Sequence, residues 1–260
     1  MVVRVYRPFK HSDRNPTVPT NAIKYNQEIR LLATSKLSEL RDCIKCPADE
    51  IRMGDVSENP TAPDSNFQRA KEVYKSGFFY INGCFYNDMR RPAECSDYSE
   101  VIRTWAAANK KRGIGPFRTA LMEETAVKDL EVRLRVLLCV FLFSKPGELA
   151  IQVRLGYPYV YVHQGEHEHL FTFNDIRLMA ADDPQRAADY PHELALGTKR
   201  SKFCMVCYMQ VAVWVTTEND RVPEDPYFFC NECFFGFNYT FDGQKLGNFK
   251  AFEYIDPNAL

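Results

Sequence analysis

The sequence has no apolar run long enough to cross a bilayer and almost no net charge. Its longest apolar run spans only residues 136–143, between Arg135 and Lys145, whereas a membrane-spanning helix needs about 20 such residues. The chain carries 33 Lys and Arg residues against 34 Asp and Glu residues, a formal net charge of −1. We therefore expect no membrane segment, and we expect any contact with DNA to come from local basic patches or partner subunits.

Motifs of common enzyme classes and of secretion are missing as well. The sequence has no HExxH motif, no Gly-rich phosphate loop and no nucleophile elbow. Its start, MVVRVYRPFK, lacks the apolar run and small-residue cleavage site of a secretory signal. The nine cysteines are an odd number, and in a reducing compartment they would be free or metal-bound. We therefore expect a non-enzymatic protein of a reducing compartment.

Four cysteines form the strongest chemical signal that is present. Cys204-x2-Cys207 and Cys230-x2-Cys233 are separated by 22 residues. Each pair turns the backbone tightly and offers two thiolates to one ion, and four thiolates close the tetrahedral shell that Zn²⁺ prefers. A closed shell stabilises the fold and leaves no position for a reacting water. The spacing predicts a structural zinc site, with two disulfides or four buried thiols as the alternative.

The pattern of apolar residues predicts an α+β fold. The chain has 260 residues, 45% of them apolar, so it can bury a sizeable core. Two β-favouring runs, at residues 2–6 and 28–33, precede an amphipathic helix that Ser35 begins and Pro47 ends. An Asn-Gly turn within residues 77–86 predicts a hairpin. This order predicts a ubiquitin-like β-grasp body, followed by a C-terminal zinc-stabilised, β-rich module.

Two further helices are predicted. The first begins with Asp97 and Glu100 as a capping box, and its apolar residues share one face: Tyr98, Val101, Ile102 and Trp105. Its end is followed by a basic run of Lys110, Lys111 and Arg112. Such cations complement the helix dipole, and contact with nucleic-acid phosphates is the alternative role. A second helix is predicted from Thr125 to Leu134.

Three histidines and three basic residues are the remaining candidate site residues. His163, His167 and His169 gather in a predicted turn, where imidazoles can either converge on one ion or remain solvated. If such a metal kept an open position, Glu166 or Glu168 could act as a base, so a metal hydrolase is an alternative function. The basic residues lie immediately before Cys204, on a loop that zinc would hold rigidly for contact with phosphates: Lys199, Arg200 and Lys202.

Several stretches resemble a known family over most of the chain. They are VRVYRPF (3–9), ELRDCIKC (39–46), SGFFYINGCFYND (76–88), LGYPYVYVHQG (155–165), NDIRLM (174–179), PEDPYFFCNECF (223–234) and IDP (255–257). Together with the His-x5-His pair and the two CxxC pairs, they resemble the SNAP-finger family, the third subunit of the small-nuclear-RNA-activating protein complex. The alternative of a ubiquitin-like adaptor is weaker, since one four-cysteine site is too few for the usual RING.

The resemblance implies a function and a set of partners. It implies a DNA-binding subunit of a multi-subunit factor that recognises the proximal sequence element of small nuclear RNA promoters for RNA polymerases II and III. It further implies a nuclear location, a Myb-repeat partner subunit, and zinc bound by the four cysteines. His163 and His169 would be the histidines of an extended finger, but Val162 and His167 stand where the family usually has cysteine. A second zinc site would therefore lose one ligand and change another.

The resemblance also suggests how the chain is divided. The tripeptide Val-Arg-Leu occurs at residues 132–134 and again at 153–155, and the apolar segment between the copies departs from the family pattern. We interpret this segment as an insertion or a retained intron. The predicted parts are a β-grasp-like domain at 1–134 with a long loop at 52–65, an insertion at 135–152, and the SNAP-finger zinc domain at 153–260.

Overall fold

The chain forms two compact units. The computed structural model describes residues 1–8, 24–63, 67–109, 114–132, 152–198 and 200–259. Unit 1 consists of Met1–Ile44 and Tyr74–Gly197, and unit 2 consists of Lys45–Val73 and Thr198–Leu260. No helix within the described residues combines the length and apolar character needed to cross a membrane.

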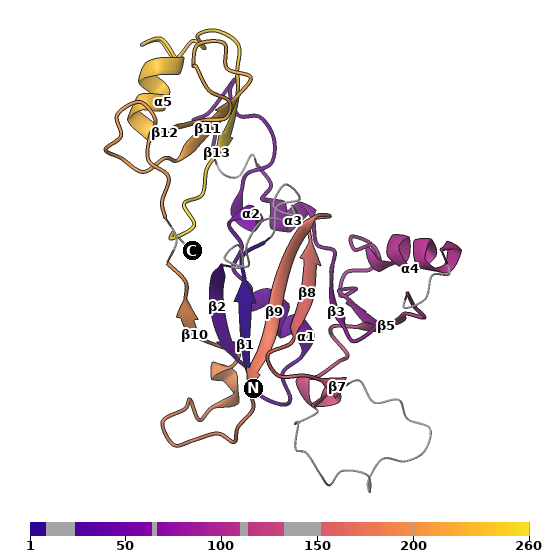
Figure 1. The fold of residues 1–260 in the computed structure, drawn as a ribbon. Helices are drawn as coiled ribbons and strands as arrows, with labels where there is room; N and C mark the ends of the chain where they lie inside the picture. The colour runs from indigo at the N-terminus through magenta and orange to yellow at the C-terminus, as the bar shows by residue number, and fades with distance from the viewer. Residues whose placement is uncertain (9–23, 64–66, 110–113, 133–151, 199, 260) are drawn as a thin grey trace, which may run out of the picture. The chain divides into compact units, whose positions relative to one another are not determined.

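Unit 1 is built on one eight-stranded sheet with the order β10-β2-β1-β9-β8-β3-β4-β5. Figure 1 shows β2, β1, β9 and β8 running side by side. The β4–β5 pair is parallel and the other neighbours are antiparallel. The strands are β1 (Val2–Tyr6), β2 (Tyr25–Arg30), β3 (Gly77–Ile81), β4 (Cys84–Asn87), β5 (Arg118–Leu121), β8 (Pro158–His163), β9 (His167–Asp175) and β10 (His192–Leu196).

Local sequence patterns account for much of this sheet. Both turn residues of the β3–β4 hairpin have positive φ, 47° at Asn82 and 78° at Gly83, as a type I′ turn requires. The predicted helix forms as α1 (Leu37–Cys43), which buries Leu37 and Leu40. They pack in a core with apolar residues from β1, β2, β3, β8 and β9. The α+β class is confirmed. The ubiquitin-like arrangement stays a prediction, since β1 lies between two antiparallel neighbours in a larger sheet.

The predicted domain limits do not coincide with the two units. Strands β8, β9 and β10 follow residues 135–152 in the sequence but join β1–β5 in one sheet. The loop at 52–65 is part of the first predicted domain, whereas Lys45–Val73 belongs to unit 2. Residues 135–151 of the predicted insertion lie outside the described residues.

The predicted helix from Thr125 to Leu134 is wrong over residues 125–132, and its last two residues lie outside the described part of the chain. The chain forms a 3₁₀ turn, η4 (Val127–Asp129), and then β6 (Glu131–Val132), which pairs with β7 (Gln152–Val153). The Val127 and Lys128 backbone N–H groups donate to carbonyl oxygens at Ser35 and Ala33. These long-range bonds replace the i→i−4 bonds of an α-helix.

Much of the apolar face of the predicted helix α4 (Ser99–Ala108) is exposed. Val101 is 77% exposed and Trp105 is 52% exposed. The helix starts slightly later than predicted, where Ser99 N–H donates to Asp97 Oδ1 at 2.8 Å. A second 3₁₀ turn, η5 (Ala187–Asp189), completes the helical segments of unit 1 in the part of the chain that the structure describes.

Unit 2 has a three-stranded antiparallel sheet and its own aromatic core. The sheet order is β12-β11-β13, and the elements are α2 (Pro47–Glu50), α3 (Ala70–Val73), β11 (Trp214–Thr217), β12 (Tyr227–Phe229), α5 (Asn231–Asn238) and β13 (Lys250–Glu253). Trp214 stacks on Phe234 with ring centroids 4.6 Å apart. The N-terminal part of unit 2 joins β13, because Val56 N–H donates to Ala251 O at 2.9 Å and Ala251 N–H donates to Asp55 Oδ1 at 2.9 Å.

Candidate metal centre

The first cysteine pair lies in a tight turn that precedes β11. Cys204 N–H donates to Gln210 O at 2.8 Å, and Tyr208 N–H donates to Cys204 O at 2.9 Å. Tyr208 has a φ of 58°, the left-handed conformation that ends this turn. The two-residue spacing therefore forms the knuckle that the sequence predicts, with the Cys204 and Cys207 side chains on one turn.

The second pair lies where β12 passes into α5. Cys230 is the N-cap residue of α5, and its sulfur accepts a hydrogen bond from Cys233 N–H at 3.5 Å. The first turn of the helix thus places Cys233 beside Cys230. Because Trp214 Nε1 donates to Asn231 Oδ1 at 3.1 Å, this turn is also fixed to β11.

The two pairs converge. All four sulfurs lie within 4.8 Å of one another, and Cys207 Sγ is 3.9 Å from Cys230 Sγ. Tetrahedral Zn–S bonds of about 2.3 Å would place sulfurs about 3.8 Å apart. The eight cysteines of the described residues are all free, and no disulfide joins these four. The cluster could therefore hold a metal ion, and its donor set suits zinc.

The surroundings of the cluster favour the deprotonated thiolate at Cys207 and disfavour it at Cys230 and Cys233. Backbone N–H groups of Met209 and Gln210 donate to the Cys207 sulfur and lower the pKa of that thiol to about 7. Burial raises the pKa values of Cys230 and Cys233. Several thiolates would thus accumulate only if a cation balanced their charge, so metal binding would release protons.

The three predicted histidines lie on two neighbouring strands, and two of them are buried. His163 ends β8, while His167 and His169 lie on β9, and the turn itself spans residues 164–166. The Nε2 atoms of His163 and His169 are 3.2 Å apart, and these two side chains are buried. His167 is only half-buried, and its ring centroid lies 5.4 Å from that of His163.

The buried pair has a defined tautomer. His169 Nδ1 lies 2.9 Å from Tyr6 O, and a carbonyl can only accept, so Nδ1 carries the proton. The Nε2 atom of His169 is then an acceptor when the ring is neutral, and it lies within hydrogen-bond distance of His163 Nε2. A histidine that ligates a metal usually donates its other N–H in this way. Two tetrahedral Zn–N bonds of about 2.0 Å would place the nitrogens about 3.3 Å apart, close to the observed separation.

The amino-acid sequence is also similar to known proteins. A model of the family described as snRNA-activating protein complex (SNAPc), subunit 3, matches residues 27–143 and 149–255. The chain belongs to this family. The snRNA-activating protein complex subunit 3 of Bos taurus is 39% identical over 234 residues, and that of Rattus norvegicus is 39% identical over 238 residues. These alignments cover 90% of this chain and 51% of each relative, so the chain spans about half the length of the curated relatives it matches.

The basic residues predicted for this member of the SNAPc subunit 3 family are only partly described. Arg200 and Lys202 are exposed in unit 2. Lys202 Nζ lies 3.7 Å from the centroid of the Phe228 ring, a cation–π contact that the sequence did not predict. Four of the predicted contacts lie outside the described residues: Lys110, Lys111, Arg112 and Lys199.

Apolar residues beside the cysteines of this SNAPc subunit 3 family member were also not predicted. Val206, Tyr208 and Met209 are 43%, 75% and 79% exposed. They lie within or next to the Cys204–Cys207 turn. Their exposure could not have been found from periodicity, since the turn has no regular secondary structure.

Proposed function

We propose that this chain is a non-enzymatic, zinc-stabilised subunit of an snRNA-activating complex that contacts promoter DNA. In this proposal it acts in the nucleus, at the proximal sequence element of snRNA promoters used by RNA polymerases II and III. It does so together with other subunits, including one with Myb repeats. Membership of the SNAPc subunit 3 family is the observation that carries the proposal. The balanced net charge of −1 favours shared over autonomous DNA binding.

The zinc in this proposal is structural. Cys204, Cys207, Cys230 and Cys233 would supply four thiolates and leave no open position for water. The ion would join the turn before β11 to the start of α5. It would thereby fix the turn that directly follows the basic segment. His163 and His169 are proposed as ligands of a second zinc, with His167 as a third candidate.

Metal content separates these sites. Purified wild-type protein is expected to contain two equivalents of zinc by elemental analysis, one at the cysteines and one at the histidines. The double variant His163→Gln/His169→Gln should then contain one. One equivalent in the wild type would limit zinc to the cysteine cluster, and none would contradict the zinc proposal altogether.

DNA contact is assigned to the segment that leads into the cluster. Arg200 and Lys202 are exposed, and Lys199 is their neighbour in the sequence. Only two residues separate Arg200 from Phe203, which forms a β-bridge with Val211. This anchor holds the basic segment close to the cluster. Positive groups held in place bind phosphates with little loss of conformational entropy.

Replacing Lys199, Arg200 and Lys202 together by alanine is expected to weaken binding of the assembled complex to promoter DNA. Each lost phosphate contact should reduce the slope of log affinity against log salt by about 0.9. The measurement is DNA binding over a series of salt concentrations. Lys250→Ala is the control, because its ammonium already pairs with Glu218 at 2.6 Å. An unchanged slope in the triple variant would remove these residues from the interface.

The two alternative functions receive less support. A metal hydrolase needs an open coordination position, whereas the facing Nε2 atoms of His163 and His169 are buried. A ubiquitin-like adaptor would rest on the β-grasp, and the sheet of unit 1 has eight strands. We therefore retain the DNA-contacting subunit as the proposed function.

A further inference from the structure

Unit 1 contains a pocket that the proposed DNA and zinc contacts do not use. Its volume is about 560 Å³. Much of its wall is apolar and includes Leu31, Val127, Leu130, Ile176, Leu178 and Met179. We call it the Leu178 pocket. A volume of this size lies within the range of about 300–1,000 Å³ that is typical of binding pockets.

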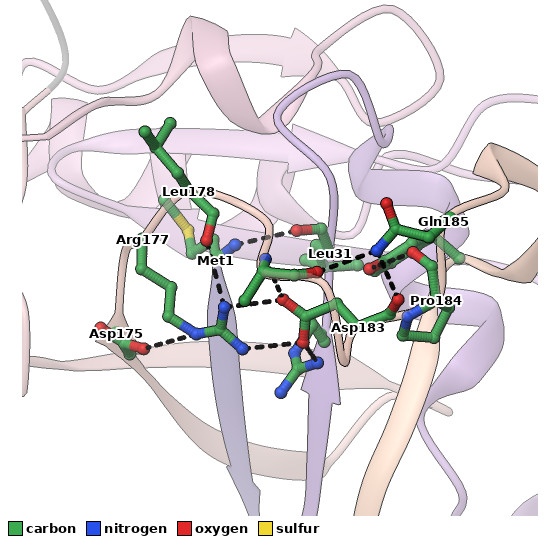
Figure 2. Close-up of polar contacts among 11 residues, drawn as sticks. Met1, Leu31, Asp175, Arg177, Leu178, Asp183, Pro184 and Gln185 are labelled. Atoms are coloured by element: carbon green, nitrogen blue, oxygen red, sulfur yellow. Dashed lines mark hydrogen bonds and ion pairs between the residues drawn. The ribbon is translucent and has the colours of Figure 1, made fainter.

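A buried carboxylate holds the loop that forms one wall of this pocket. The Asp183 side chain is only 3% exposed. It accepts hydrogen bonds from Arg177 Nη1 at 2.6 Å, from Arg177 Nη2 at 2.8 Å and from Ala180 N–H at 2.8 Å, and it also pairs with Arg30. Figure 2 shows this network, in which the Arg177 guanidinium faces the carboxylate of Asp183. The hydrogen bonds from Arg177 lower the pKa of Asp183, so the network remains charged at neutral pH.

The held loop presents apolar side chains to solvent. Ile176, Leu178 and Met179 are 38%, 92% and 51% exposed. In Figure 2 the Leu178 side chain extends away from the polar network. Loop residues without such anchoring could fold back over the pocket, but the Asp183 network fixes the backbone on which they lie. Clustered apolar side chains on a fixed surface are typical of protein–protein interaction sites.

One charged side chain that lines the pocket has no partner among the described residues. Arg30 and Arg177 share Asp183, and Arg177 also faces Asp175 at 3.8 Å. These four charges balance. Lys128 lines the pocket as well, and its exposed ammonium has no ion-pair or hydrogen-bond partner among the residues that the structure describes. A ligand that fills the apolar pocket would therefore gain a charge-assisted contact from a carboxylate near Lys128.

We propose that the Leu178 pocket binds a segment of a partner subunit that carries apolar anchor residues and an acidic side chain. The anchors occupy the pocket and cover Leu178, while the carboxylate pairs with Lys128. A small molecule could fill the pocket but would leave Leu178 and Met179 in water, so a macromolecule fits the exposed surface better. This inference rests on the proposed function, because it requires other subunits.

Two variants and a cross-linking residue test this inference. The full chain, tagged and expressed with the other subunits of its complex, is purified as wild type, as Leu178→Asp and as Lys128→Glu. Leu178→Asp removes a central anchor, so it is expected to lower the co-purified amount of one subunit by about tenfold or more. Lys128→Glu should lower it less, since an exposed pair contributes less. Phe241→Asp, at a residue that is 105% exposed in unit 2, is the matched control.

A photo-reactive residue at position 178 identifies the occupant. The expected cross-link joins this position to a partner segment with apolar residues and an Asp or Glu. Replacing that acid by Lys should restore assembly with Lys128→Glu. A cross-link to a second copy of this chain, the absence of any cross-link, or full assembly of Leu178→Asp would overturn the inference.

Failure of this inference can be told apart from failure of the proposed function. If wild-type protein does not co-purify the other subunits, the proposed function itself fails. If wild type and both variants assemble equally, only the Leu178 pocket is excluded. Thermal unfolding and metal content of each variant show whether the chain is folded. Leu178 and Lys128 are exposed, so we expect both values to match wild type.

Discussion

Cys204→Ser is expected to abolish metal binding at the cysteine cluster and to unfold the part of unit 2 around it. Cys204 is fully buried, and its sulfur is one of the four that converge. A hydroxyl is a poor ligand for zinc at neutral pH, since it is not deprotonated there. Structural zinc contributes on the order of 10 kcal/mol to folding in small modules, comparable with the whole stability of about 5–15 kcal/mol of a typical domain.

Trp214 offers a direct readout for this prediction. The chain has two tryptophans, and Trp214 is 8% exposed where it stacks on Phe234. In a Trp105→Phe background, Cys204→Ser should shift the Trp214 emission to the red, as in unfolded protein. Zinc analysis on the same sample should show the loss of one equivalent. Cys95→Ser is the control, because Cys95 is a half-buried thiol of unit 1 outside both groups of possible metal ligands. A native emission spectrum in Cys204→Ser would contradict a structural role.

The cysteine site could be predicted because its information is local. Each pair needs only a tight turn, and the turn at Cys204 and the helix start at Cys230 are set by neighbouring residues. The β3–β4 hairpin is similar, since Asn82 and Gly83 specify their own turn. The helix α5 was not predicted, because the run of aromatic residues that follows Cys233 favours strand by propensity. Packing of Phe234 against Trp214 overrides that preference.

Long-range pairing explains most of what could not be predicted. β9 pairs with β1, and β10 pairs with β2, across more than half of the chain. Neither pairing leaves a mark within a window of ten or twenty residues. The Leu178 pocket was missed for the same reason. It joins the start of the chain, the η4 turn and the loop after β9, and none of these segments has a binding motif by itself.

Exposure is a second limit on sequence-based prediction. The apolar face of α4 predicts a helix correctly, but periodicity cannot say whether that face meets the core or solvent. Val101 and Trp105 are in fact exposed. The basic residue Lys202 shows the converse problem, since its charge lies over the Phe228 ring instead of being solvated on all sides. Both outcomes depend on residues that are distant in sequence.

Phe171→Ala is expected to destabilise unit 1 by about 3–5 kcal/mol. Phe171 is fully buried on β9, which lies between β1 and β8. Its ring contacts Phe79 with centroids 5.2 Å apart and Tyr159 at 5.8 Å. Truncation removes these contacts and leaves a cavity that the two flanking strands cannot close without losing their pairing.

Hydrogen exchange measured by mass spectrometry can follow this loss in unit 1 itself. Peptides that cover β1 and β9 should exchange faster in Phe171→Ala, whereas Phe241→Ala, at a fully exposed position, should change nothing beyond about 0.5 kcal/mol. His169 lies two residues before Phe171 on the same face of β9. The variant should therefore also loosen the His163–His169 pair and lower any zinc bound there. Unchanged exchange in β1 would mean that this aromatic cluster does not hold the sheet together.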